Sequence, residues 1–445
     1  MFEFDALEIE RAADIETEAL SRAGLRAGDS LGWLGLNDPR ALVLLRACEQ
    51  LGARYVPLNG RLAPSELATI VRHAGLQRLL HDGPMATLAR QVVQLAALPQ
   101  PAAPGHERGD LLLAYTSGTT GEPKGAIHTA RAMQANVAAA IDAQGFDADT
   151  RTLAVLPLFH VGGLCIQVLP TLAAGGRVRL HSRFDAGAWL DDVATWRPTT
   201  SLLVPATMRA LIEHPRWSGT DLSSLAFVNS GSQIVPRLLI DAFHARGVPV
   251  CQVYGATETG PMTLALRQHE AMAHPGSAGR PALGVEIRLV DGEVQARAPQ
   301  LARGYHRAPD DPAFAEGWFR TGDLAQVDGD GYFQIVGRSK ELIISGGENV
   351  YPAEIENLAL GDPAVAEAAV VGLADARWGE VPVLALVARP GATIDPSRLQ
   401  VLFDQRLARF KHPRRIVTLA ALPRTALGKV RKSELAQAFA ADGSP

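Results

Sequence analysis

The segment TSGTTGEPKG at residues 116–125, which follows an apolar run at 111–115, constrains this chain more than any other. Its hydroxyls, glycines and Lys124 supply O–H donors, backbone N–H groups and a point charge, a combination suited to a polyphosphate. A Walker A loop is excluded because that pattern has Gly-Lys-Ser/Thr at a helix start, whereas Pro123 precedes Lys124 here. A plain surface turn after a strand is the alternative. We expect a nucleotide enzyme whose phosphate contacts come from Thr116, Ser117, Gly118, Thr119, Thr120, Gly121 and Lys124.

Length and charge narrow the class of protein. A chain of 445 residues exceeds what one hydrophobic core usually serves, so two or more domains are expected. The net charge of −4 gives no basic footprint, which argues against nucleic acid as a partner, and no Lys/Arg cluster suggests a lipid surface. Cys48, Cys165 and Cys251 are scattered without a C-x-x-C spacing, which argues against disulfides and thiolate metal sites.

Nothing in the sequence predicts export or a membrane span. The N-terminus carries Glu3, Asp5 and further acids instead of a basic region followed by an apolar one. The long uncharged stretch at 153–176 is interrupted by Pro157, Pro170 and several glycines, so we interpret it as a buried strand, a turn and a helix. The expected location is therefore the cytoplasm.

Short apolar runs alternate with amphipathic stretches over roughly the first three hundred residues, which is typical of βα units that build largely parallel sheets. The pattern predicts a helix over 6–25, a strand over 30–36, a helix over 40–51, a strand over 55–58 and a helix beginning at Pro64. The pattern changes near residue 337, and we place the domain boundary at 337–341.

Five further motifs follow the first: LFHVGG at 158–163, YGATE at 254–258, TGD at 321–323, GRSKELIISGGENVYPAEIE at 337–356 and PRTALGK at 423–429. In this order they resemble the adenylate-forming (AMP-binding) superfamily, in its acyl-CoA synthetase type, over nearly the whole chain. The resemblance implies an α/β fold, with a large N-terminal AMP-binding domain of βα-layered sheets at 1–337. A small α+β C-terminal domain at 338–445 would be mobile and joined by a hinge near residue 340.

The YGATE motif follows an expected strand at 248–253, so Tyr254 and Gly255 come at a strand's carboxyl end, where α/β sheets bind ligands. Thr257 can hydrogen-bond a phosphate, and Glu258 supplies the carboxylate oxygen that Mg²⁺ prefers. The predicted metal ligands are Glu258 and Thr116. The alternative is a capped helix start with Thr257 and Glu258 exposed.

The resemblance gives roles to residues that mean little alone. Asp323 and Arg338 would hold the ribose hydroxyls of the nucleotide. Lys429 would be the catalytic lysine of adenylation, where a preorganised ammonium stabilises charge on the α-phosphoryl oxygens. Lys340 would be the hinge about which the C-terminal domain rotates between two reactions. Gly346 and Gly347 would lie beside the pantetheine arm of coenzyme A (CoA), since glycine permits close backbone approach.

The acyl pocket is the least defined part of the site. His160 is either a core histidine or a gate to the carboxylate pocket, where relatives have an aromatic residue. Gly231 and Ser232 stand beside the expected adenine position, where relatives commonly have Gly-Ala-Pro, so Ser232 and Gln233 depart from the pattern. Arg209 and Arg237 are the candidates to pair a second substrate carboxylate, and neither lies in a motif. The predicted substrate contacts are Phe159, His160, Val161, Gly163, Ser230 and Met262.

These features predict an ATP-dependent carboxylic acid–CoA ligase that acts through an acyl-adenylate with Mg²⁺ assistance, on a medium-chain or aryl acid. The alternatives are an adenylation enzyme that loads a carrier-protein thiol or uses the adenylate without CoA, a succinylbenzoate-type CoA ligase, and a non-catalytic nucleotide-binding regulator. Retention of Lys124, Glu258, Asp323, Arg338 and Lys429 together argues against the regulator. The sequence leaves open a monomer or a homodimer.

Overall fold

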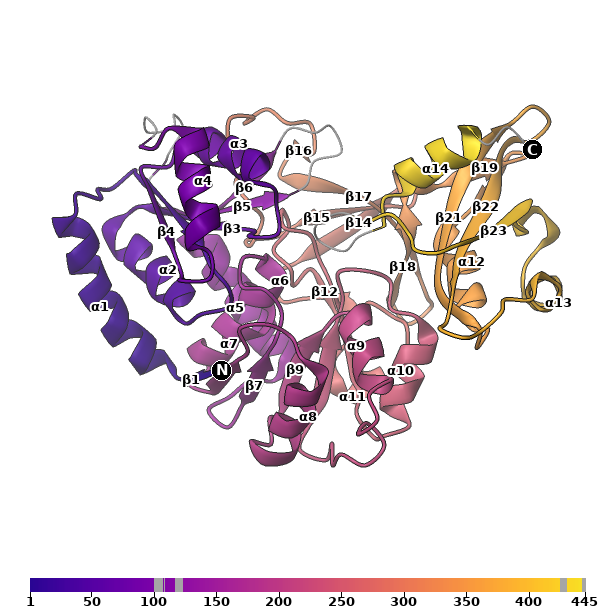
Figure 1. Cartoon of the computed structure of the whole chain (residues 1–445), viewed down its shortest axis with the longest axis horizontal. Coiled ribbons are helices and arrows are strands. Elements are labelled where there is room, and N and C mark those ends of the chain that lie inside the picture. Colours follow the sequence, from indigo (N-terminus) through magenta and orange to yellow (C-terminus); the bar gives the residue numbers. More distant parts are fainter. Residues whose placement is uncertain (100–106, 108, 117–122, 425–429, 442–445) are drawn as a thin grey trace. The chain divides into compact units, whose positions relative to one another are not determined.

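A computed structural model describes residues 1–99, 107, 109–116, 123–424 and 430–441 (Figure 1). The chain divides into two compact units. The first contains Met1–Val235, Asp241–Arg288 and Gln295–Thr321, and the second contains Pro236–Ile240, Leu289–Val294 and Gly322–Pro445. The expected α/β fold class is confirmed by the arrangement of strands and helices within each unit.

The first unit is built around an eight-stranded sheet in the order β1-β8-β7-β9-β10-β11-β12-β13. Strands β7 to β11 run parallel, whereas β1, β12 and β13 are antiparallel to their neighbours. The parallel strands therefore present their carboxyl ends at one edge. The strands are β1 (Phe2–Phe4), β7 (Arg151–Ala154), β8 (Arg177–Leu180), β9 (Thr200–Leu203), β10 (Phe227–Ser230), β11 (Val250–Tyr254), β12 (Leu264–Ala265) and β13 (Arg280–Pro281).

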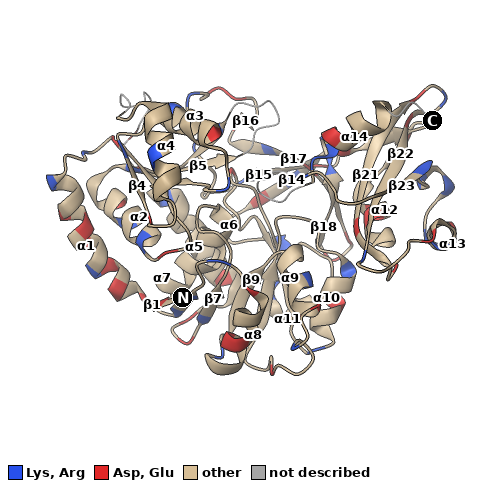
Figure 2. Ribbon diagram, in the orientation of Figure 1, with Lys and Arg blue, Asp and Glu red and all other residues tan. Residues whose placement is uncertain are grey.

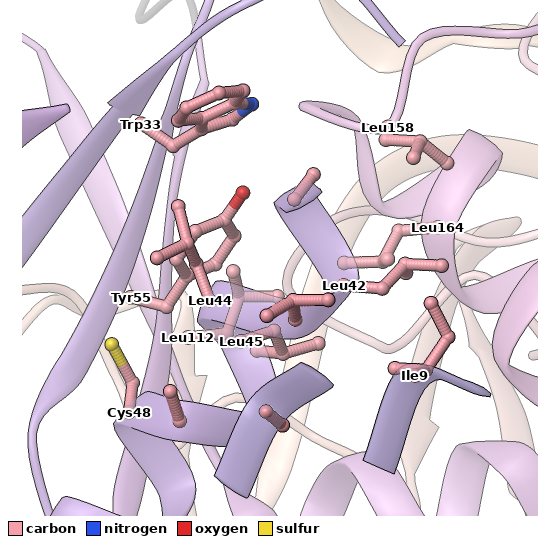
Figure 3. Packing of buried hydrophobic residues seen from close by; sticks show 14 of the residues in the cluster. Ile9, Trp33, Leu42, Leu44, Leu45, Cys48, Tyr55, Leu112, Leu158 and Leu164 are labelled. Atoms are coloured by element: carbon pink, nitrogen blue, oxygen red, sulfur yellow. The ribbon is translucent and has the colours of Figure 1, made fainter. Parts of the chain in front are cut away.

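The first unit also contains a five-stranded sheet in the order β4-β2-β3-β5-β6. Strands β2 to β5 are parallel to their neighbours, and β6 returns antiparallel beside β5. Figure 3 shows Leu42, Leu44 and Leu45 packed near Tyr55 and Leu112, within one core cluster that also includes Leu158 and Leu164. The strands are β2 (Ser30–Leu34), β3 (Arg54–Leu58), β4 (Arg78–His81), β5 (Asp110–Thr116) and β6 (Lys124–Thr129).

The helices of the first unit begin and end where local chemistry dictates. Helix α1 (Ala6–Arg22) starts with a reciprocal capping box between Asp5 and Glu8. Helix α3 (Pro64–Ala74) begins with proline in its first turn, and α2 (Arg40–Leu51) ends at left-handed Gly52. The others are α4 (Ala86–Ala96), α5 (Ala130–Gln144), α6 (Val161–Gly163), the π-helix η1 (Leu164–Val168), α7 (Leu169–Ala173), α8 (Ala186–Thr195), α9 (Pro205–Ile212) and α11 (Gln268–Ala271). Helix α10 (Arg237–His244) is divided between the two units.

The expected elements are confirmed with small changes at their ends. The first helix ends at Arg22 because Gly24 takes a positive φ of 92° and turns the chain. Strand β11 begins at Val250 instead of residue 248, since Pro249 lacks the N–H that a central strand donates. The stretch 153–176 is a strand end followed by α6, η1 and α7, as expected from its interruptions.

The second unit contains a sheet in the order β20-β19-β22-β21, with β23 beside β22. Its core gathers Ile343, Ile355, Leu384, Leu399 and Phe403. These strands are β19 (Ile343–Ser345), β20 (Glu348–Val350), β21 (Val365–Asp375), β22 (Gly379–Ala388) and β23 (Arg415–Leu419), and the helices are η2 (Ser339–Glu341), α12 (Pro352–Ala359), α13 (Pro396–Arg406), η3 (Arg409–Lys411) and α14 (Lys432–Ala441).

A further antiparallel sheet has the order β14-β15-β17-β16, with β18 paired to β17. Its strands are β14 (Glu286–Val290), β15 (Glu293–Arg297), β16 (Phe314–Ala315), β17 (Trp318–Val327) and β18 (Phe333–Arg338). Figure 2 shows that Lys and Arg positions are interspersed with Asp and Glu positions along the helices and loops. Within the described ranges, no helix combines the length and apolar character needed to cross a bilayer.

Candidate active site

Strands β5 and β6 hold the two ends of the TSGTTGEPKG segment. Thr116 ends β5 and pairs directly with Lys124, the first residue of β6. The Thr116 Oγ1 hydroxyl also donates to the Lys124 carbonyl over 3.4 Å. The two predicted phosphate contacts therefore face each other across an antiparallel pair, while Ser117, Gly118, Thr119, Thr120 and Gly121 lie outside the described residues.

Lys124 has two partners on the segment that follows Gly304. Its Nζ lies 2.8 Å from an Asp311 carboxylate oxygen and 4.7 Å from the centre of the Tyr305 ring. Burial alone would raise the pKa of Asp311, but hydrogen bonds from Lys124 and from the Ala313 backbone N–H outweigh burial and lower it. The Lys124 ammonium is thus held in one place by a charge and a ring.

Glu258 is buried, with 9% of its surface exposed, and its Oε1 accepts a hydrogen bond from the Tyr305 hydroxyl over 2.6 Å. Burial and the adjacent Glu258 carboxylate raise the pKa of Tyr305, so the phenol stays protonated as the donor. No helix begins at Thr257 or Glu258, so the alternative of a capped helix start with both exposed is wrong. Tyr305 joins Glu258 and Lys124 into one cluster, hereafter the Glu258–Lys124 cluster, with Asp311 as its fourth member.

The YGATE segment turns sharply because of Gly255. Tyr254 ends β11 and pairs with Leu264, and a Cβ at Gly255 would lie 2.6 Å from the Pro261 carbonyl oxygen. Only glycine fits that approach. Burial lowers the pKa of His128 in β6 to about 4, although a hydrogen bond with the Thr257 backbone opposes the shift. The His128 ring is therefore neutral and hydrogen-bonded to the Thr257 backbone.

The chain after β10 is tightly constrained. A Cβ at Gly231 would come within 2.3 Å of the Val253 carbonyl oxygen, and the next residue, Ser232, has a φ of 68°. Left-handed backbone at a non-glycine residue is costly and concentrates at functional sites. Ser230 is fully buried, and its hydroxyl has no hydrogen-bond partner among the described residues. Ser232, which departs from the family pattern, is thus also the strained residue.

The predicted acyl-pocket residues come from three elements. Phe159 and His160 are half-buried, with ring centres 4.8 Å apart, just before α6. Val161 and Met262 are buried, and a Cβ at Gly163 would meet the Pro157 carbonyl oxygen at 2.2 Å, so backbone fills the space beside that glycine. The π-helix η1 follows, a rare form that occurs often at functional sites.

Arg209 and Arg237, the candidates for a second substrate carboxylate, lie on α9 and α10. Arg209 is 3.9 Å from Glu213 one turn along its own helix. Arg237 begins α10.

The two residues predicted to hold the ribose lie within the second unit. Asp323 in β17 and Arg338 in β18 are directly opposite each other, and Arg338 Nε lies 2.6 Å from Asp323 Oδ1. Asp323 is buried, whereas the Arg338 side chain is about half exposed. The strand pairing explains how residues fifteen apart reach one point, as the spacing had predicted.

Lys340 and the glycine pair follow in the same unit. Lys340 is exposed in the short 3₁₀ turn η2 between β18 and β19. Gly346 and Gly347 form the β19–β20 hairpin turn with φ of 63° and 87°, a backbone that favours glycine at both places. A Cβ at Gly346 would lie 2.8 Å from the Trp378 ring, and Gly346 N–H donates to the Trp378 carbonyl over 2.7 Å.

Sequence reasoning missed the residues that hold the motifs in place. Tyr305 and Asp311 belong to no motif, and their roles depend on contacts with residues far away in sequence. Trp378 was missed for the same reason. Arg377 and Arg414 stack on its ring at 5.0 and 5.4 Å, which gives the glycine turn a cationic, aromatic neighbour. Lys429 lies outside the described residues.

The comparisons agree with this geometry. Residues 8–306 match the AMP-binding enzyme family and residues 354–429 match the AMP-binding enzyme C-terminal domain. An indoleacetate–CoA ligase of Aromatoleum aromaticum is 42% identical, over 95% of this chain and 90% of its own. The amide bond synthetase McbA of Marinactinospora thermotolerans has a TM-score of 0.88 at 29% identity, over 97% of this chain and 94% of its own.

A third relative is the o-succinylbenzoate CoA synthetase of Bacillus subtilis, solved in complex with its acyl-adenylate intermediate. Its TM-score is 0.84 at 30% identity, over 96% of this chain and 92% of its own. The family match covers well over half of the sequence. The chain therefore belongs to the AMP-binding enzymes, the adenylate-forming class whose homologues include CoA ligases.

Proposed function

We propose that this chain is an AMP-forming acid–CoA ligase: a carboxylic acid, ATP and CoA give acyl-CoA, AMP and pyrophosphate through an acyl-adenylate. The observation that carries the proposal is the Glu258–Lys124 cluster. It places a buried carboxylate, held by Tyr305, beside a lysine held by Asp311 at the mouth of the phosphate-binding segment. A carboxylate and an ammonium so arranged suit a metal–polyphosphate substrate.

In the first reaction the acid's carboxylate oxygen attacks the α-phosphorus, and pyrophosphate leaves. Lys124 and the hydroxyls of the 116–120 segment would bind the β- and γ-phosphates, with Lys124 exchanging Asp311 for phosphate oxygens. Lys429 would stabilise charge at the α-phosphoryl oxygens. The substrate acid is already ionised at neutral pH, so the step needs no general base.

Mg²⁺ fits the donors at this site. One Glu258 oxygen accepts from Tyr305, and the other remains to bind the ion, with Thr116 as the second proposed ligand. Magnesium commonly reaches proteins through one or two carboxylates plus substrate phosphates, so one carboxylate is sufficient. When bound, it would neutralise charge on the phosphate oxygens.

In the second reaction the CoA thiol sulfur attacks the acyl carbonyl carbon, loses its proton and displaces AMP. Asp323 and Arg338 would hold the ribose, Tyr254, Gly255, Gly231 and Ser232 would line the adenine, and Thr257 would contact phosphate. Gly346 and Gly347 would admit the pantetheine arm. Arg377 and Arg414 on Trp378 offer positive charge next to that turn, which suits the phosphates of CoA.

A hinge at Lys340 would let one site serve both reactions, between domains 1–337 and 338–445. Glu341, the next residue, lies 2.9 Å from Lys432 of α14, which is also 2.8 Å from Glu356 of α12. These ion pairs tie the chain to the small domain immediately after Lys340. The exposed Lys340 is the last position before that anchor.

We propose an aryl or medium-chain acid as substrate and the cytoplasm as the location. The acyl-pocket residues Phe159, Val161 and Met262 are apolar or aromatic. The relatives act on indoleacetate and o-succinylbenzoate, both aryl acids. The three free, buried cysteines suit a reducing compartment.

A second candidate uses the same adenylate with another acceptor. The likeness to an amide bond synthetase favours an amine, and a carrier-protein thiol is the other choice. The first reaction and its residues would be unchanged, so only the acceptor separates these candidates from the CoA ligase.

The test is pyrophosphate release with ATP and Mg²⁺ across short, medium-chain, aryl and dicarboxylic acids, each with and without CoA. We expect multiple turnovers that require both an aryl or medium-chain acid and CoA. Release that CoA does not accelerate would favour another acceptor. No release with any acid would favour a nucleotide-binding regulator and would contradict the ligase.

A further inference from the structure

We propose that His306 is a positioning residue for the metal and phosphate contacts, and that the buried Arg54 guanidinium locks its ring in place. The inference rests on the proposed function, because it explains how Tyr305 and Asp311 come to lie against Glu258 and Lys124. None of the six sequence motifs contains either residue.

Arg54 is an unusual residue to bury. It is fully buried at the start of β3, and its Nε donates to the Ser30 hydroxyl over 3.2 Å. The structure gives it a second contact, from Nη1 to His306 Nδ1 at 3.4 Å. Asp110 attracts it through space, but the Asp110 carboxylate is itself hydrogen-bonded by Arg303 at 2.9 and 3.1 Å. His306 is therefore one of two hydrogen-bond acceptors that the described residues offer this buried cation, and Ser30 is the other.

The contacts of His306 select one tautomer. Arg54 has only donors, so His306 Nδ1 must accept, and the proton must be on Nε2, which donates to the His73 carbonyl over 3.0 Å. The His306 ring also packs edge-on against His73, with centres 5.2 Å apart. Both ring nitrogens are thus used, and the ring has one orientation.

The backbone on either side of His306 leads to the Glu258–Lys124 cluster. His306 N–H donates to the Gly125 carbonyl over 2.7 Å, next to Lys124. The preceding residue, Tyr305, donates to Glu258, and Asp311 pairs with Lys124. Arg307 follows with a left-handed φ of 61°, a conformation that neighbouring contacts must hold.

The same buried network reaches β5. His73 Nδ1 and the Tyr115 hydroxyl are 2.8 Å apart, and Tyr115 immediately precedes Thr116. His306 thus links strands β5 and β6, which carry the proposed phosphate contacts, to the segment that carries Tyr305 and Asp311. Moving the His306 ring would move Tyr305 and Asp311 relative to Glu258 and Lys124.

The experiment compares His306→Phe with His306→Asn. Phenylalanine keeps the ring but offers Arg54 no acceptor, whereas the asparagine oxygen occupies nearly the place of Nδ1. We expect His306→Phe to raise KM for MgATP about tenfold, the scale found when residues behind metal ligands are changed. His306→Asn should recover most of that loss. KM for the acid should change little.

A second measurement separates positioning from folding. A synthetic acyl-adenylate mixed with CoA bypasses the β- and γ-phosphates, so His306→Phe should form acyl-CoA from it at nearly the wild-type rate. His181→Phe is the matched control, since His181 is also buried and hydrogen-bonded, to Asp192 at 2.5 Å on the β8–α8 side of the eight-stranded sheet. We expect His181→Phe to lower the melting temperature without raising KM for MgATP.

Two results would overturn the inference: parallel loss of both half-reactions in His306→Phe, or equal KM for MgATP in the Phe and Asn variants. Both results are compared with the wild-type enzyme, which must itself perform the two half-reactions. If the wild-type chain adenylates no acid, the proposed function itself fails, which is a different outcome.

Discussion

The two halves of the proposed reaction are built differently. The Glu258–Lys124 cluster is held by side-chain partners: the buried Tyr305 hydrogen-bonds Glu258, and the half-buried Asp311 pairs with Lys124. The glycine turn at 346–347 and Lys340 are exposed and depend on backbone conformation. Phosphate and metal chemistry requires charges fixed before the substrate arrives, whereas thiol delivery requires a backbone that leaves room.

The largest expected effect tests the proposed catalytic role of Lys429. Lys429→Ala should slow adenylation by about 10²–10³-fold while ATP still binds, because the ammonium that we propose as the stabiliser of the transition state is lost. Single-turnover pyrophosphate release measures the adenylation rate, and calorimetry measures ATP binding. Arg409→Ala, which removes an exposed cation of the second unit, is the control. An undiminished rate would contradict the assignment of Lys429.

Within the Glu258–Lys124 cluster, Glu258→Gln should lower adenylation by about 100-fold and raise the Mg²⁺ concentration needed, because the carboxylate that we propose as the metal ligand is removed. Tyr305→Phe keeps that carboxylate and should cost only about tenfold, as for other residues behind a metal ligand. Magnesium titrations of pyrophosphate release measure both. Equal losses in the two variants would mean that Tyr305 does more than orient Glu258.

The buried histidine beside Thr257 predicts a pH effect on stability. Burial lowers the pKa of His128 to about 4, below the usual 6.5, so the folded protein resists a proton that the unfolded chain accepts. The free energy of unfolding should therefore fall as pH drops from 6.5 to 4, by up to about 3 kcal/mol from this residue.

Urea unfolding of the wild type and of His128→Phe at several pH values isolates that contribution. The variant should lose less stability over this interval than the wild type. Parallel pH profiles would show that His128 is not the group responsible.

The proposed hinge at Lys340 should affect the second half-reaction more than the first. Lys340→Pro should fix φ and restrict rotation, slowing thioester formation about tenfold while adenylation changes little. Rapid-quench measurement of each half-reaction provides the comparison. Equal slowing of both steps would count against a hinge at Lys340.

The smallest expected effect concerns the exposed turn. Gly346→Ala meets the Trp378 ring at 2.8 Å and must keep a φ of 63°, whereas Gly347→Ala meets only the strain of its φ of 87°. We expect losses of about 2 and about 1 kcal/mol in the free energy of unfolding, respectively. Chemical denaturation measures both losses. A larger loss in Gly347→Ala than in Gly346→Ala would contradict the claim that contact with the Trp378 ring dominates.

The sequence predicted the elements and motifs better than the contacts that support them. Periodicity placed the helix at Arg40–Leu51 correctly because its apolar face and the following Gly52 are local signals. Glu258 was predicted from YGATE, but its burial depends on Tyr305, forty-seven residues away. Asp311 and His306 were missed because a lone acid or histidine in a loop has many uses, and only the folded chain brings it to Lys124 or Arg54.

Ser232 illustrates the opposite case. It was noted as a departure from the family pattern, and the structure adds that its backbone is left-handed, with a φ of 68°. A single sequence can show that a residue is unusual for its motif. It cannot show the backbone strain, which only the φ of 68° in the folded chain reveals.

The most direct test of the central claim is product stoichiometry. The purified chain is incubated with an aryl acid such as indoleacetate, ATP, Mg²⁺ and CoA, and acyl-CoA, AMP and pyrophosphate are quantified by mass spectrometry and a coupled assay. The account predicts the three products in equal amounts over many turnovers. Pyrophosphate formed without acyl-CoA, or no product with any acid, would contradict it.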